Sequence, residues 1–176
     1  MAESLSFEGG QELQRGPLGR VLYQACRIWA LAGGGVLLAL IGMSLVSIIG
    51  RKLYAAPVRG DIELMEMGAA IAIASFLPIC EMRGLHLKVD TFTLRAPQWM
   101  QTGLDVIGHG LCLLAALVLA WRTALQLGDT LTYGDVSTLL TIPLWIPLAL
   151  IVPSLLLLAL ASAWRITHCL APGGRP

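Results

Sequence analysis

The sequence has little charge for its length. Aspartate, glutamate, lysine and arginine make up 13% of its 176 residues, about half of the roughly 25% found in an average soluble domain. Hydrophobic residues make up 56%, and the mean hydropathy is +0.75. Since the few charges lie between long apolar runs, the composition argues against an ordinary soluble domain. It indicates a chain that crosses a membrane several times.

The sequence also lacks the patterns that several kinds of site require. Its four cysteines have no C-x-x-C spacing, so neither a zinc site nor a disulfide framework is expected. A net charge of +1, with no extended basic patch, gives no sign of a nucleic-acid partner. There is no ATP-binding loop, and nothing suggests chemistry on a substrate. We therefore expect no enzyme activity, no cofactor and no metal.

Four apolar runs are long enough to be membrane spans, at residues 28–49, 62–80, 104–127 and 142–164. About 20 helical residues cross a hydrocarbon core of about 30 Å, and backbone groups in lipid must be paired within a helix. We predict an all-α polytopic membrane domain over residues 28–164 with four transmembrane helices. A disordered or interfacial tail over 1–27 precedes it, a second tail over 165–176 follows it, and no cleavable signal peptide is apparent.

The positive charges predict the orientation. Lysine and arginine are enriched in cytoplasmic loops, and with both termini cytoplasmic eight of them would lie inside. Three would lie outside: Arg51, Lys52 and Arg59. We therefore predict that both termini and residues 83–90 are cytoplasmic, and that 51–61 and 128–141 form the outer face.

Acidic and histidine residues within the spans allow two interpretations each. Glu63 and Glu66 share a helix face near the outer end of the second span. They fit either a buried carboxylate pair for an ion, a proton or a partner's arginine, or an interfacial helix start favoured by the helix dipole. Asp105 and His109, at i and i+4 in the third span, fit a proton relay or the orientation of a metal ligand. The alternative is an interfacial aspartate and a histidine bonded to a neighbouring helix.

Other residues of the spans suggest packing and anchoring. The glycines around Gly33 and the Gly68/Ala72 pair allow two helices to approach closely. Arg122 lies near the predicted outer end of the third span, where it can snorkel to the headgroups as an anchor. The tryptophans fall near predicted span ends, as in an aromatic belt: Trp29, Trp99, Trp121, Trp145 and Trp164.

The stretch RGLHLKVD, residues 83–90, is the most polar in the middle of the chain. As a helix it would place Arg83, His86 and Asp90 on one face. Apolar residues at 85, 87 and 89 also alternate with polar ones, which fits an extended segment equally well. Either form would lie at the membrane interface, and one histidine with one aspartate does not make a metal site. A water-facing hinge between the second and third spans is the plainest interpretation.

Three motifs in this order resemble those of a known family, the small Q-type permease subunits of TRAP (tripartite ATP-independent periplasmic) transporters. Its members have four spans in a chain of this length, glutamate at the start of span two, an R-x-G-x-H-[IL]-x-V-D segment, and P-x-W near span four. The corresponding segments here are DIELMEMG, EMRGLHLKVDTF and STLLTIPLWIPLALIVP, and the resemblance covers residues 29–164. The motif-matched residues are Glu63, Glu66, Arg83, Gly84, His86, Val89, Asp90, Pro143 and Trp145.

The resemblance implies a three-part secondary transport system of the bacterial inner membrane. A periplasmic substrate-binding protein would capture a small organic anion, and a large permease subunit would move it, driven by a sodium gradient. The small subunit would scaffold the large one within the membrane lipid, with the 83–90 motif fixing the junction of spans two and three. Candidate contacts for the periplasmic partner are Arg51, Lys52, Arg59, Asp129 and Asp135.

Two other classes of protein remain open from the sequence. One is a four-helix haem-binding membrane anchor of a respiratory enzyme, in which two of His86, His109 and His168 would ligate a haem. Against it, His86 and His168 lie in or beside predicted loops. The other is a standalone membrane assembly protein. Neighbouring genes for a large permease and a periplasmic binding protein would distinguish the transporter subunit from both.

Overall fold

The structure, a computed structural model, describes residues 17–54, 60–83 and 98–170. These residues form four α-helices: α2 (Pro17–Tyr54), α3 (Asp61–Arg83), α5 (Gln98–Tyr133) and α6 (Trp145–Leu170). The described ranges contain no strand beyond one isolated β-bridge, between Val136 and Pro143. All four helices are long and apolar enough to cross a membrane. The prediction of an all-α fold with four transmembrane helices is confirmed.

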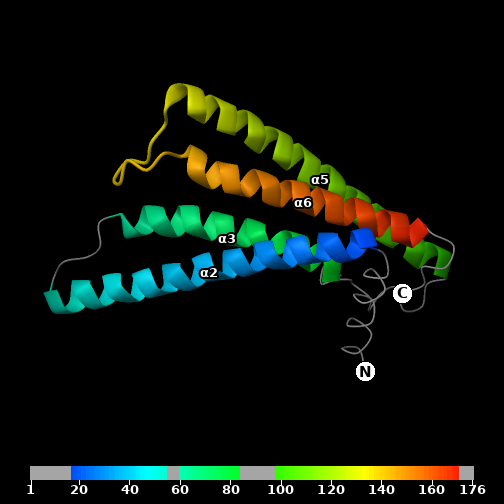
Figure 1. The fold of residues 1–176 in the computed structure, drawn as a ribbon, viewed down its shortest axis with the longest axis horizontal. Helices are drawn as coiled ribbons and strands as arrows, with labels where there is room; N and C mark the ends of the chain where they lie inside the picture. The colour runs from blue at the N-terminus through cyan, green and yellow to red at the C-terminus, as the bar shows by residue number, and fades with distance from the viewer. Residues whose placement is uncertain (1–16, 55–59, 84–97, 171–176) are drawn as a thin grey trace.

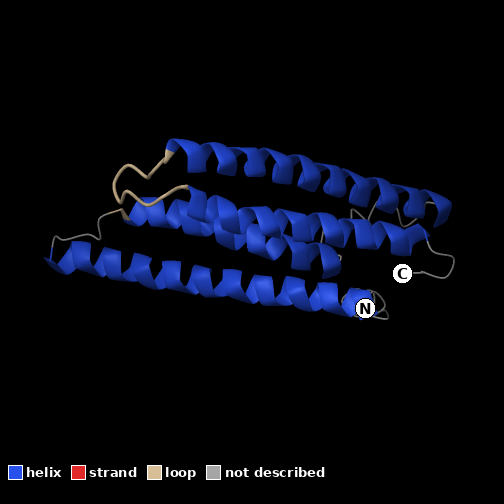
Figure 2. Cartoon of the chain, turned by 45° about the horizontal axis from the view of Figure 1, so that its top comes forward, coloured by secondary structure: helices blue, strands red, loops and turns tan. Residues whose placement is uncertain are grey.

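The helices lie side by side, with α3 and α6 in the middle (Figures 1 and 2). Helix α2 packs mainly on α3, and α5 packs on α6. The first residues of α2 and the last residues of α6 lie at the same end of the molecule (Figure 1). We name this the inner end, after the predicted orientation, and the opposite end, which holds Asp61 and Trp145, the outer end.

The helices do not share the bounds of the predicted spans. Helix α2 already begins at Pro17, so residues 17–27 of the predicted tail are helical. Proline suits a first helical turn, and no later proline interrupts α2. Helix α5 continues past residue 127 to Tyr133 and is followed by Gly134 at φ 68°, a left-handed conformation that often ends a helix. Helix α6 begins only at Trp145, because Leu144 and Ile142 bond residues 135 and 137 instead.

Glycines let α2 approach α3 closely, as the small-residue pattern predicted. A Cβ added at Gly33 would lie 2.5 Å from the Cβ of Ser75, and one added at Gly68 would lie 2.7 Å from Leu40. Gly68, Ala72 and Ser75 are all buried. Close backbone approach of this kind is a main source of helix association in lipid.

A proline inside α3 is matched by a serine of α6. Pro78 is buried in α3 and has no N–H, so the carbonyl of Ala74 lacks its helical donor. The hydroxyl of Ser154, which is fully buried, donates to that carbonyl oxygen. Because an unpaired carbonyl is costly in lipid, this bond both ties α6 to α3 and allows the proline at this position.

The sides of α2 and α5 that point away from the other helices are apolar and exposed. Four leucine side chains there are more than half exposed: Leu38, Leu53, Leu111 and Leu114. Such broad apolar faces suit lipid or another membrane protein rather than water.

Candidate functional site

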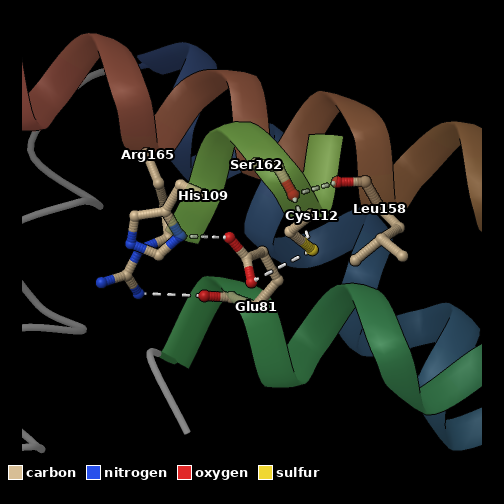
Figure 3. A network of polar contacts seen from close by, with 6 residues as sticks. All are labelled: Glu81, His109, Cys112, Leu158, Ser162 and Arg165. Carbon is tan, nitrogen blue, oxygen red and sulfur yellow. Dashed lines mark hydrogen bonds and ion pairs between the residues drawn. The ribbon is translucent and has the colours of Figure 1, made fainter. Parts of the chain in front are cut away.

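Polar side chains of the described residues gather in two clusters. The inner cluster lies in the inner halves of α3, α5 and α6 and consists of Glu81, His109, Cys112, Ser162 and Arg165 (Figure 3). The outer cluster consists of Asp61 and Glu63 at the start of α3 and the groups that bond their carboxylates. Between them, the two clusters join all four helices.

Glu81 is the centre of the inner cluster. It lies in the last turn of α3 and its side chain is fully buried. The ring of His109, on α5 and only 8% exposed, places Nδ1 2.7 Å from Glu81 Oε1. A carboxylate and an imidazole at this distance hold one proton between them, and with the proton on Nδ1 the ring is the donor. This contact connects α3 directly to α5.

Further contacts bring α6 into the inner cluster. The thiol of Cys112, three residues after His109 and hence on the same face of α5, donates to Glu81 Oε2 at 3.8 Å. The Ser162 hydroxyl lies 3.4 Å from Cys112 Sγ and 3.0 Å from a carbonyl of its own helix. Arg165 Nη1 donates to the backbone oxygen of Glu81 at 2.9 Å (Figure 3). This carbonyl lies at the C-terminus of α3, where oxygens lack helical donors.

Glu63 organises the loop between α5 and α6. Its carboxylate accepts bonds from the hydroxyls of Ser137, at 2.6 Å, and Thr138, at 2.5 Å. It also accepts the backbone N–H groups of Leu139 and Leu140, at 2.8 and 3.2 Å. Four donors to one carboxylate fix the loop onto the start of α3, since charge-assisted bonds are the strong ones.

Asp61 joins α2 to α3 beside this loop. Its Oδ2 accepts a bond from the Ser47 hydroxyl at 2.6 Å and lies 3.5 Å from an Arg51 guanidinium nitrogen. Its Oδ1 accepts the N–H of Ile62 in the first turn of α3, where backbone N–H groups have no partner within the helix. The preceding Gly60 has φ 74°, and a Cβ there would lie 2.4 Å from Leu140. Only glycine fits this corner.

The remaining predicted site residues are separate from one another. Glu66 is exposed and its side chain makes no hydrogen bond or ion pair with the described residues, whereas the Glu63 carboxylate bonds the α5–α6 loop. Arg83 ends α3, with a guanidinium nitrogen 3.4 Å from the Tyr23 hydroxyl. Pro143 lies in the β-bridge and Trp145 is the first residue of α6.

Of the predicted periplasmic contacts, Arg51 is paired with Asp61. Lys52, Asp129 and Asp135 are exposed toward the outer end. Five predicted site residues lie outside the described ranges: Arg59, Gly84, His86, Val89 and Asp90. The question of a helical or extended form for residues 84–95 lies outside those ranges too.

The sequence interpretation missed Glu81. For His109 it offered two interpretations, a pair with Asp105, whose side chain is not described, and a bond to a neighbouring helix; the structure shows the second. The sequence did contain a signal that pointed to Glu81. Glu81 directly follows a long apolar run, and an acidic side chain at such a position needs a partner.

The described residues include no candidate metal centre. Within the described ranges, no group of three or more His, Cys, Asp and Glu side chains is placed to hold a metal ion. His168 packs edge-on against Trp164, with ring centroids 5.1 Å apart. The polar side chains of both clusters bond mainly to one another and to backbone groups.

The fold and its clusters define a class: a polytopic membrane protein of four helices, joined internally by buried polar contacts. The family described as "Tripartite ATP-independent periplasmic transporters, DctQ component" matches residues 40–171. The chain belongs to this family, so it is a small membrane subunit of a TRAP transporter, in the bacterial inner membrane. Family membership confirms the resemblance and selects it over the haem anchor and the standalone assembly protein. No curated protein and no solved structure matches the chain.

Proposed function

We propose that this subunit scaffolds the large permease subunit of its transporter. In this proposal the assembly takes up a small organic anion, captured by a periplasmic binding protein, and uses a sodium gradient as the driving force. Family membership over residues 40–171 carries the proposal, because the DctQ component is one of three parts.

The internal contacts support a scaffolding role. The inner cluster joins α3, α5 and α6, Asp61 joins α2 to α3, and Glu63 joins the α5–α6 loop to α3. A subunit held at both ends presents a fixed surface to a partner, and a preorganised surface loses less entropy on binding. The polar groups serve the subunit's own helices rather than a substrate.

We also propose that both termini face the cytoplasm, since lysine and arginine are more numerous at the inner end. The exposed side chains of Lys52 and Asp135 would then face the periplasm, and Asp129 would lie in the last turns of α5 on the same side. There they are available to the binding protein. In the same orientation, the motif residues Arg83, His86 and Asp90 would fix the cytoplasmic junction that follows α3.

Co-purification tests the scaffolding role. The tagged small subunit, co-expressed with the large subunit, should recover it from detergent-solubilised membranes in a stable ratio. A His86→Ala/Asp90→Ala double variant should recover less. Full recovery with wild-type uptake would contradict the role given to the motif, and recovery of no large subunit by the wild-type chain would contradict the scaffold itself.

The energy source is tested in whole cells. Uptake of a labelled carboxylate or sialic acid should collapse when an ionophore dissipates the sodium gradient, and should survive moderate ATP depletion. Uptake that ignores the sodium gradient would contradict the proposed driving force.

A further inference from the structure

Arg122 is an exposed cation on the side of α5 that points away from the other helices. It makes no hydrogen bond or ion pair with any residue of the described ranges. With Leu117, Val118 and Trp121 it lines a shallow depression, which we call the Arg122 face. Trp121 is 69% exposed. Because Ala116 and Ala120 are buried on the opposite side of the helix, this face points away from α6.

The register of α5 against α6 gives the depth of Arg122. Cys112 of α5 lies beside Ser162 of α6, 3.4 Å apart, and the two helices are antiparallel (Figure 1). Arg122 comes ten residues after Cys112, which is about 15 Å closer to the outer end. On α6 the same step back from Ser162 leads to the turn that holds Ser154.

The position of Arg122 relative to α3 gives its depth in the membrane. Ser154 bonds the carbonyl of Ala74, so Arg122 is level with the middle of α3. From Glu63 to Arg83, α3 rises about 30 Å, which matches a hydrocarbon core of about 30 Å. With the hydrocarbon core placed over these residues, Arg122 would lie about 15 Å from either edge. This depth differs from the predicted anchor near the headgroups, because α5 extends beyond the expected end of the span.

An arginine at this depth does not suit a face covered by lipid. A charged side chain near the bilayer centre is costly, and such residues almost always face a partner group or a water-filled cavity. Snorkelling serves side chains near helix ends, and half a bilayer is more than the side chain can bridge. The guanidinium thus calls for a carboxylate, which it can bind with two hydrogen bonds.

We propose that the Arg122 face docks a membrane helix of the large permease subunit, and that this helix carries a carboxylate at mid-bilayer depth. The proposal rests on the scaffolding function proposed above. A second copy of this chain meeting the same face would bring two arginines together, and an anionic lipid headgroup lies half a bilayer away. Tryptophan and arginine side by side are also the residues most enriched at the centres of interfaces.

The first test removes the charge. Arg122→Leu and Arg122→Glu should each lower the affinity for the large subunit about thirtyfold or more, as loss of one partner of a buried charge pair does. Recovery of the large subunit should fall accordingly. Arg20→Leu is the matched control, since it removes an exposed arginine at the inner end of α2, and it should leave recovery unchanged. Replacing the facing acid of the large subunit by lysine should restore binding to the Arg122→Glu chain.

The second test uses photo-crosslinking from a neighbour of Arg122. A photo-crosslinking amino acid at Val118 should yield an adduct with the large subunit, and that adduct should be lost in the Arg122→Glu background. Adducts with lipid only, or with a second copy of this chain, would overturn the proposal. So would full recovery of the large subunit by Arg122→Glu. If instead the wild-type chain recovers no large subunit, the proposed scaffolding function fails, and the two failures are distinguishable.

Discussion

Replacing Glu81 with leucine should weaken the inner end of the helix assembly. The change removes the acceptor of the His109 ring and of the Cys112 thiol and leaves a buried imidazole without that bond. Leaving a buried polar group without a hydrogen-bond partner costs about 1–3 kcal/mol, and the loss of the bonds themselves adds to this cost. We therefore expect a loss of about 2–4 kcal/mol in the free energy of unfolding, at the upper end of ordinary substitutions.

The interaction itself is isolated by a double-mutant cycle with His109→Leu. Hydrogen bonds to charged groups contribute about 1.5–3 kcal/mol in soluble proteins, whereas cycles between membrane helices average about 0.6 and reach about 1.7 kcal/mol. Full burial of Glu81 places this pair at the top of the membrane range. We expect a coupling energy of about 1.5 kcal/mol, with the double variant much less destabilised than the sum of the single ones.

The assay is reversible unfolding in mixed micelles, followed by far-ultraviolet circular dichroism as the share of denaturing detergent rises. Glu66→Leu is the matched control, because Glu66 is an exposed glutamate of the same helix and should change stability by less than about 0.5 kcal/mol. Single-variant effects that add to within about 0.5 kcal/mol would refute the coupling. An effect of Glu81→Leu no larger than that of Glu66→Leu would refute the importance of the cluster.

Three further substitutions test other contacts in the same assay. Gly33→Ala should cost about 1–3 kcal/mol by forcing a Cβ onto Ser75. Gly35→Ala, where a Cβ meets nothing within 4 Å, is the control and should be neutral or stabilising. Equal effects of the two substitutions would contradict the α2–α3 packing. Glu63→Gln should cost about 1–3 kcal/mol, since an amide nitrogen cannot accept the donors of the α5–α6 loop, and hydrogen exchange should then quicken at the two backbone amides that it bonds; unchanged exchange would argue against the outer cluster. Ser154→Ala should cost about 0.6–1.7 kcal/mol, and no loss at all would show that the proline-freed carbonyl of α3 needs no donor.

Much of the fold followed from the sequence because long apolar runs have few alternatives in lipid. The number of helices and the all-α class were predictable, and so was a close helix approach at Gly33 and Gly68, although the sequence did not say which helices these glycines join. Helix ends were not predictable, since hydropathy marks where a chain is apolar rather than where its helix stops. For this reason the predicted span 104–127 placed Arg122 near a span end, whereas α5 runs on to Tyr133.

The contacts within the clusters were harder to predict. Spacing along one helix suggested Glu66 as a neighbour for Glu63, and Asp105 or a residue of another helix as the partner of His109. The partners that the structure shows, the α5–α6 loop and Glu81, lie 74 to 77 and 28 residues away in the chain. Such pairs depend on the register between helices, which one sequence does not contain. The family motifs identified the subunit, but the residue at the centre of the inner cluster was overlooked beside them.

Uptake by a reconstituted system is the sharpest test of the scaffolding role of this subunit. The large permease subunit is placed in liposomes with and without this chain, and accumulation of a labelled organic anion is measured with the binding protein outside and an inward sodium gradient. We expect sodium-dependent accumulation only when this subunit is present, and its loss with Arg122→Glu. Equal accumulation by the large subunit alone would contradict the claim that this chain is a required scaffold.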